Sequence, residues 1–117
     1  MNEAIKIAIQ LSKNENNSNF EIAEINYILS KAYLLKGDYN NSLKILLASK
    51  SVESHLSNFQ KNDILISKIK ILRELSLDKE AKKLLKTAEK HSEFIVYSNE
   101  KLLVKKAIFI EKAKFLY

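Results

Sequence analysis

Residues that interrupt helices are nearly absent from this chain: its 117 residues include one glycine and no proline. Glycine and proline are the two residues that disfavour helix interiors most strongly, so long helical spans can form here without a break. Apolar residues make up 46% of the chain and charged residues 29%, which is typical of a folded domain rather than a disordered segment. We therefore predict an all-α fold in a chain whose length suits one domain.

The single glycine marks a turn between two predicted helices. Gly37 follows an apolar run and stands directly before Asp38. A glycine in this place can adopt the left-handed conformation that ends a helix, and the aspartate after it can cap the next helix. We expect a first helix that ends at Lys36 and a second that runs to about Glu53, folded back on each other as a hairpin.

This hairpin pattern recurs further along the chain. Residues 18–21 read Ser-Asn-Phe-Glu and residues 57–60 read Ser-Asn-Phe-Gln, at a separation of 39 residues. Both segments have the serine, followed three residues later by Glu or Gln, that forms a capping box at a helix start. Small residues align in the same way, since Ala4, Ser42 and Ala81 are 38 and 39 residues apart. A small residue lets two helices cross closely, so these positions predict the contact points of the hairpins.

Eight residues of the first hairpin follow one order of small, aromatic, glycine-aspartate-aromatic, small, large and small positions: Ser30, Tyr33, Gly37, Asp38, Tyr39, Ser42, Leu46 and Ser49. In this order and spacing the chain resembles the tetratricopeptide repeat family, in a bacterial form with a period of 38 to 39 residues rather than the usual 34 or so. A second copy follows the pattern less closely, on Leu65, Ile69, Leu72, Ala81, Leu85 and Ala88. Its turn contains Ser76 in place of the glycine.

The resemblance implies stacked antiparallel hairpins that form an α-α superhelix of about six helices. We expect a single repeat domain with a lone second helix at 1–13, full hairpins at 18–55 and 57–95, and the first helix of a further repeat at 98–117. Segment 101–117 ends in an apolar series: Ile108, Phe109, Ile110, Phe115, Leu116 and Tyr117. We expect the chain to be a fragment of a longer protein, or to bury this segment by self-association through Lys101–Tyr117.

The resemblance also implies that first helices line the concave inner face of the stack. The candidate partner-binding residues on this face are Tyr27, Lys31, Leu34, Ile66, Lys70 and Arg73. Three of them are basic, so the expected partner is a peptide or helix with acidic residues, bound in the concave groove with Tyr27 as an apolar anchor. The competing interpretation treats these lysines as ordinary solvated side chains of a spacer.

Two further functions remain open. Tandem repeats of this length resemble the sensory or regulatory segment of bacterial signalling proteins, ahead of a histidine kinase or transcription-regulator domain. Residues 59–117 carry the whole formal charge of +6, with thirteen lysines and one arginine against eight acids, which raises nucleic-acid binding as a third function. Its basic residues, among them Lys82, Lys83, Lys86 and Lys90, are not interleaved with the aromatic side chains that a stacking platform needs, so we expect no nucleic acid as partner.

Residues that carry chemistry are few. The chain has no cysteine, and its two histidines, His55 and His91, fall at the ends of predicted second helices without other ligands at metal-binding spacing. A histidine there suits the helix dipole. We predict a non-enzymatic protein with no catalytic residues, cofactor or metal.

No apolar run approaches the roughly 20 residues that cross a bilayer, and the N-terminal segment lacks the pattern of a secretion signal. We expect no membrane insertion and a cytoplasmic location. A periplasmic location would apply if the segment belongs to a membrane-anchored sensor.

Overall fold

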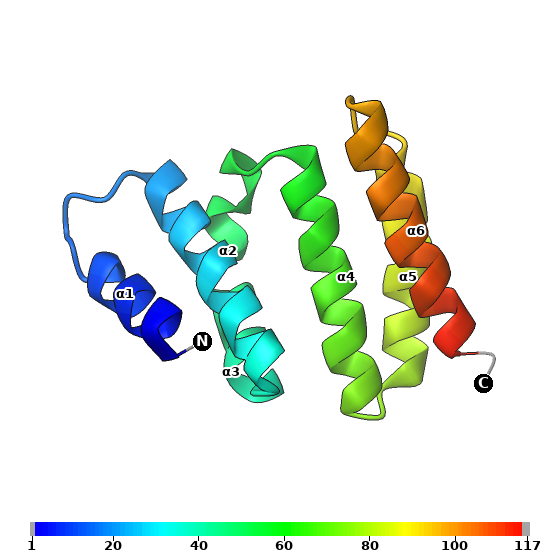
Figure 1. Ribbon diagram of the computed structural model, residues 1–117, viewed down its shortest axis with the longest axis horizontal. Helices are drawn as coiled ribbons and strands as arrows, with labels where there is room; N and C mark the ends of the chain where they lie inside the picture. The colour runs from blue at the N-terminus through cyan, green and yellow to red at the C-terminus, as the bar shows by residue number, and fades with distance from the viewer. Residues whose placement is uncertain (1, 116–117) are drawn as a thin grey trace. The chain divides into compact units, whose positions relative to one another are not determined.

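The computed structural model describes residues 2–115, and these fold into helices without any strand (Figure 1). The helices are α1 (Asn2–Ser12), α2 (Asn19–Lys36), α3 (Tyr39–Ala48), a short 3-10 helix η1 (Lys50–His55), α4 (Asn58–Glu74), α5 (Asp78–Ser92) and α6 (Ser98–Lys114). The all-α prediction is therefore confirmed.

The chain divides after Leu56 into two compact units, between the two predicted hairpins. The first unit contains α1, α2, α3 and η1, and the second contains α4, α5 and α6. Because residues 57 and 58 are uncharged, the second unit holds the entire formal charge of +6.

In the first unit, α2 packs against both α1 and α3. One core cluster of this unit contains Ile5, Ala8, Leu29 and Ala32, with Ile9, Ile25, Tyr33 and Ile45 packed around them. The apolar residues of α1 are not all buried, since Ile7 and Leu11 are each 54% exposed. Only the face of α1 that carries Ile5 and Ala8 meets α2, which leaves an apolar edge on the unit.

In the second unit, α4 and α5 form a hairpin and α6 packs against both (Figure 1). Its core contains Ile66, Ile69, Ala81, Leu85, Ala88, Ile95, Val104 and Ile108. Ala81 and Ala88 are fully buried, as is Ser42 in the first unit, so small residues do lie where the helices pack closely. The Ser42 hydroxyl also donates to the carbonyl of Ser30 on α2, at 2.8 Å.

Both predicted capping boxes form. The Ser18 hydroxyl accepts from the amide of Glu21 at 3.1 Å, while the Glu21 carboxylate accepts from the amide of Ser18 at 3.2 Å. Ser57 and Gln60 repeat this pair of bonds at 3.1 and 3.0 Å. Each box satisfies two amides that the first turn of its helix leaves unpaired.

The helix ends of the two hairpins also share one geometry. Gly37 has a φ of 84°, its amide donates to Leu34, and the amide of Asp38 donates to Tyr33. In the second hairpin Ser76 takes the same left-handed conformation, with a φ of 63°, and the amide of Leu77 donates to Leu72. These paired bonds define the Schellman motif. The second turn therefore keeps its shape without a glycine.

The second helix of the first hairpin is shorter than expected. It ends at Ala48 rather than near Glu53, and the chain tightens into η1. Ser49 has a ψ of 2°, and its hydroxyl donates to the carbonyl of Leu46 at 3.1 Å. The backbone thus passes from α-helical to 3-10 hydrogen bonding at this point.

Adding a side chain at Gly37 and removing the side chain at Ser76, the two left-handed positions, should change the stability of the chain in opposite directions. Apart from Gly37 and its two chain neighbours, no residue has an atom within 4 Å of where a Cβ would stand on Gly37, so a side chain there strains the backbone alone. We expect Gly37→Val to lower the free energy of unfolding by about 1–2 kcal/mol and Ser76→Gly to raise it by about 0.5–1 kcal/mol. Urea denaturation measures both changes. Ser76→Ala is the control, because it keeps the strain, and a stabilisation equal to that of Ser76→Gly would refute the explanation.

Candidate interaction surfaces

Three of the candidate partner-binding residues lie on α2. Tyr27, Lys31 and Leu34 are spaced four and three residues apart, so they share one side of the helix, and each is half-buried. An aromatic ring, an ammonium group and an aliphatic side chain thus lie along a single face of the first unit.

The corresponding residues of α4, 39 positions later, are placed unequally. Ile66 is 4% exposed and belongs to the core of the second unit, so it offers almost no surface to a partner. Lys70 is half-buried, and the side chain of Arg73 is 19% exposed. The cause is that α4 packs against two helices, α5 and α6, which turns part of this face inward.

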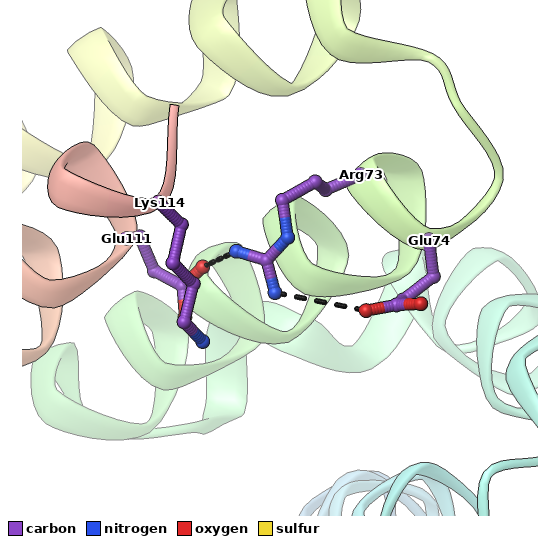
Figure 2. Close-up of polar contacts among 4 residues, drawn as sticks. All are labelled: Arg73, Glu74, Glu111 and Lys114. Atoms are coloured by element: carbon purple, nitrogen blue, oxygen red, sulfur yellow. Dashed lines mark hydrogen bonds and ion pairs between the residues drawn. The ribbon is translucent and has the colours of Figure 1, made fainter. Parts of the chain in front are cut away.

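Arg73 is held by a carboxylate of α6. Figure 2 shows its guanidinium group between the carboxylates of Glu111 and Glu74. One nitrogen bonds to Glu111 and the other lies 3.9 Å from Glu74, while the second oxygen of Glu111 lies 3.2 Å from the ammonium group of Lys114. The Glu111 side chain is only 1% exposed. Because a buried carboxylate without a cation is costly, this ion pair fastens α6 to α4.

The structure contains a second buried polar contact that the sequence did not point to. Asn62 of α4 is fully buried, and its side-chain amide group lies 3.0 Å from the carbonyl of Ala88 and 3.2 Å from Nδ1 of His91. His91 lies in the last turn of α5, as expected, and His55 is exposed at the end of η1. The only signal in the sequence for Asn62 was its position as a polar residue among apolar ones. Glu111 on α6 stands among apolar residues in the same way.

Two adjoining hollows run along the seam between α5 and α6. The first, of about 300 Å³, is lined by Glu89, Ser92, Glu93, Lys105, Ile108, Phe109 and Lys112. The second, of about 520 Å³, is lined by Lys82, Leu85, Lys86, Glu89, Lys112 and Phe115. Glu89 and Lys112 border both hollows and form an ion pair of 2.8 Å across the seam.

A second set of ion pairs crosses the seam in the first half of α6. Lys101 and Lys105 each lie 3.2 Å from the carboxylate of Glu93. Hydrogen bonds from Lys105 and Lys101 hold the pKa of Glu93 below its ordinary value. Both acids of the seam are thus already matched by lysines of α6.

The expected apolar surface of the last segment is present only in part. Ile108 is 5% exposed and belongs to the core, so placing it on that surface is wrong, and Phe115 packs partly against the core. Phe109 and Ile110 are 71% and 45% exposed, as expected. Leu116 and Tyr117 lie outside the described residues. Leu102 and Leu103, at 70% and 58% exposed, extend the apolar surface towards the start of α6.

No protein-family model matches the chain, and none of the curated proteins or solved structures compared with it does either. The likeness to tetratricopeptide repeats therefore depends on the residues of this chain alone. Within residues 2–115, no helix is long and apolar enough to cross a membrane. The same residues include no cluster of three or more histidine, aspartate or glutamate side chains that could hold a metal ion.

Proposed function

We propose that this chain is a non-enzymatic interaction module of the tetratricopeptide type, which binds a peptide or helix with acidic residues along its first helices. The observation that carries the proposal is the common plan of the two hairpins. Each begins at a serine capping box and bends at a left-handed residue, and the equivalent positions, Ser18 and Ser57 or Gly37 and Ser76, are 39 residues apart. Repeats of this kind serve chiefly as scaffolds that present one helix of each hairpin to a partner.

The charge of two half-buried first-helix positions supports an acidic partner. Lys31 and Lys70 occupy equivalent positions, 39 residues apart, and both are half-buried. A half-buried lysine keeps its ammonium group at the surface while its aliphatic stem packs against neighbours. Carboxylates on the partner would thus meet the same cation in successive repeats, and such contacts chiefly affect specificity and association rate.

The structure shows which residues a binding test should leave intact. Changing Arg73 would remove a cation from the buried carboxylate of Glu111 and so destabilise the fold. A loss of binding in such a variant could then come from lost recognition or from lost folding. Lys70 forms no such pair within residues 2–115. The informative variant therefore includes Lys70→Glu and combines it with Lys31→Glu at the equivalent position of α2; Lys31 does have a partner within the chain, so the fold of this variant has to be verified.

The experiment compares partner recovery from a lysate of the source cell, measured by quantitative mass spectrometry, for three proteins. We expect the Lys31→Glu, Lys70→Glu variant to recover the main partner about tenfold less well than the unchanged chain. The control is Lys44→Glu with Lys83→Glu, which makes the same change in charge at exposed positions of α3 and α5. Circular dichroism verifies that all three remain folded. Equal losses in both variants would show that only net charge matters, and equal recovery from all three would refute the proposal.

A further inference from the structure

We propose that the larger hollow on the α5–α6 seam is a second binding site, and that it takes an acidic amphipathic helix of a partner protein. This site goes beyond the proposed function, which uses the first helix of each hairpin. The hollow is formed instead by α5, which is the second helix of its hairpin, and by the end of α6. Its volume of about 520 Å³ is ample for a large apolar side chain. We call it the Lys82–Phe115 hollow, after two of its lining residues.

The floor of the hollow is apolar. Leu85 belongs to the core of the second unit, and Phe115 packs partly against that core. The ammonium group of Lys82 lies 5.6 Å from the centre of the Phe115 ring, a cation–π contact that holds the ring at the edge of the hollow. A leucine or phenylalanine from a partner could be seated between Leu85 and Phe115.

The rim of the hollow is positive. It has three lysines, Lys82, Lys86 and Lys112, and one acid, Glu89, which Lys112 already neutralises at 2.8 Å. Neither Lys82 nor Lys86 forms an ion pair with a carboxylate of residues 2–115. Two positive charges thus stand uncompensated beside an apolar floor, so the complementary ligand carries acids beside an apolar anchor.

The spacing of the two lysines favours a helical ligand. Lys82 and Lys86 are four residues apart on α5, so they lie on one side of the helix, about 6 Å apart along its axis. A second helix laid along the seam presents acids at the same interval when they too are four residues apart. Beyond the Glu89–Lys112 pair, exposed Phe109 continues the apolar track along the neighbouring hollow.

Other occupants fit these features less well. A phosphate backbone would satisfy the lysines but has no apolar group for Leu85 and Phe115. A second copy of this chain offers the exposed edge of α1, whose acid Glu3 is offset by Lys6. An acidic helix uses both the floor and the rim.

The test uses two synthetic helices of about 18 residues, or five turns. Both carry the same leucine stripe, flanked by glutamates in one and by lysines in the other, and fluorescence anisotropy measures binding to the full chain. We expect the glutamate helix to bind at least about tenfold more tightly than the lysine helix, with an affinity that falls as salt rises. Amide chemical-shift changes should concentrate at residues 82–89 and 109–115.

Four variants locate the binding. Lys82→Glu with Lys86→Glu should weaken binding of the glutamate helix about tenfold or more, and Phe115→Ala should weaken it as well. The matched control, Lys83→Glu with Lys90→Glu, changes the same charge at exposed positions of α5 outside the hollow and should bind within about twofold of the unchanged chain. The variant with Lys31→Glu and Lys70→Glu should also bind the glutamate helix normally. The experiment therefore distinguishes a wrong first-helix proposal from a wrong proposal for the Lys82–Phe115 hollow.

Several outcomes would overturn the proposal. These are equal binding of the two synthetic helices, equal losses in the Lys82 and Lys83 variants, or shift changes outside the hollow. Tighter binding of a duplex of about 20 base pairs, abolished by Lys82→Glu with Lys86→Glu, would assign the rim to nucleic acid instead. A dimer that the same variant dissociates would assign the hollow to a second copy of the chain.

Discussion

Ile69→Ala should lower the free energy of unfolding by about 3 kcal/mol. Ile69 is completely buried on α4, in the same core cluster as Ala81 and Ala88 of α5. Deleting three of its carbons leaves a cavity. The two alanines carry only methyl groups, which are too short to fill it. The loss therefore combines the transfer energy of the removed carbons with the cost of the cavity.

Urea denaturation of the full chain measures this change. Ile69→Val removes a single methylene, so it serves as the graded control with an expected loss of about 1 kcal/mol. A loss at Ile69 below that of the valine variant would show that the α4–α5 contact collapses to fill the space.

The second large effect concerns the ion pair between α4 and α6. Arg73→Leu should destabilise the chain by about 3 kcal/mol, because it leaves the carboxylate of Glu111, 1% exposed, with Lys114 as its remaining cation. Glu111→Leu should cost less, since Arg73 is 19% exposed and keeps Glu74 at 3.9 Å. Combining both changes should recover much of the loss, because an apolar pair replaces a buried charged pair at little cost.

Denaturation of the two single variants, the double variant and the unchanged chain completes a double-mutant cycle. We expect a coupling energy of about 2 kcal/mol between Arg73 and Glu111. Strict additivity of the two single losses would mean that the pair contributes no interaction energy and that α6 is held by apolar packing alone.

Local signals predicted most of the secondary structure. The capping boxes at Ser18 and Ser57 and the turn at Gly37 depend on a few neighbouring residues, so their outcome can be read from short segments. The left-handed Ser76 could not be predicted in this way, because a serine favours that conformation only when the surrounding hairpin imposes it. The end of α3 at Ala48, several residues before Glu53, was not predicted either.

The candidate surfaces were harder to predict, because burial depends on helices far away in the sequence. Ile66 was expected at a surface and lies in the core, since α6 returns to cover part of α4. On α6, Ile108 is buried and Phe109 beside it is exposed, although both are large and apolar. Adjacent residues on a helix point about 100° apart, and only the position of the packing partner decides which of them faces inward.

Within each unit, every helix packs against its neighbour in the chain or the one after it. Contacts of such short range cost little loop-closure entropy, and topologies of this kind belong to the fastest-folding class of domains. The turns at Gly37 and Ser76 bring the helices of each hairpin together across only a few residues. Core side chains such as Ile69 and Ile108 are therefore exposed to other chains only briefly after synthesis, which limits the time in which aggregation can compete with folding.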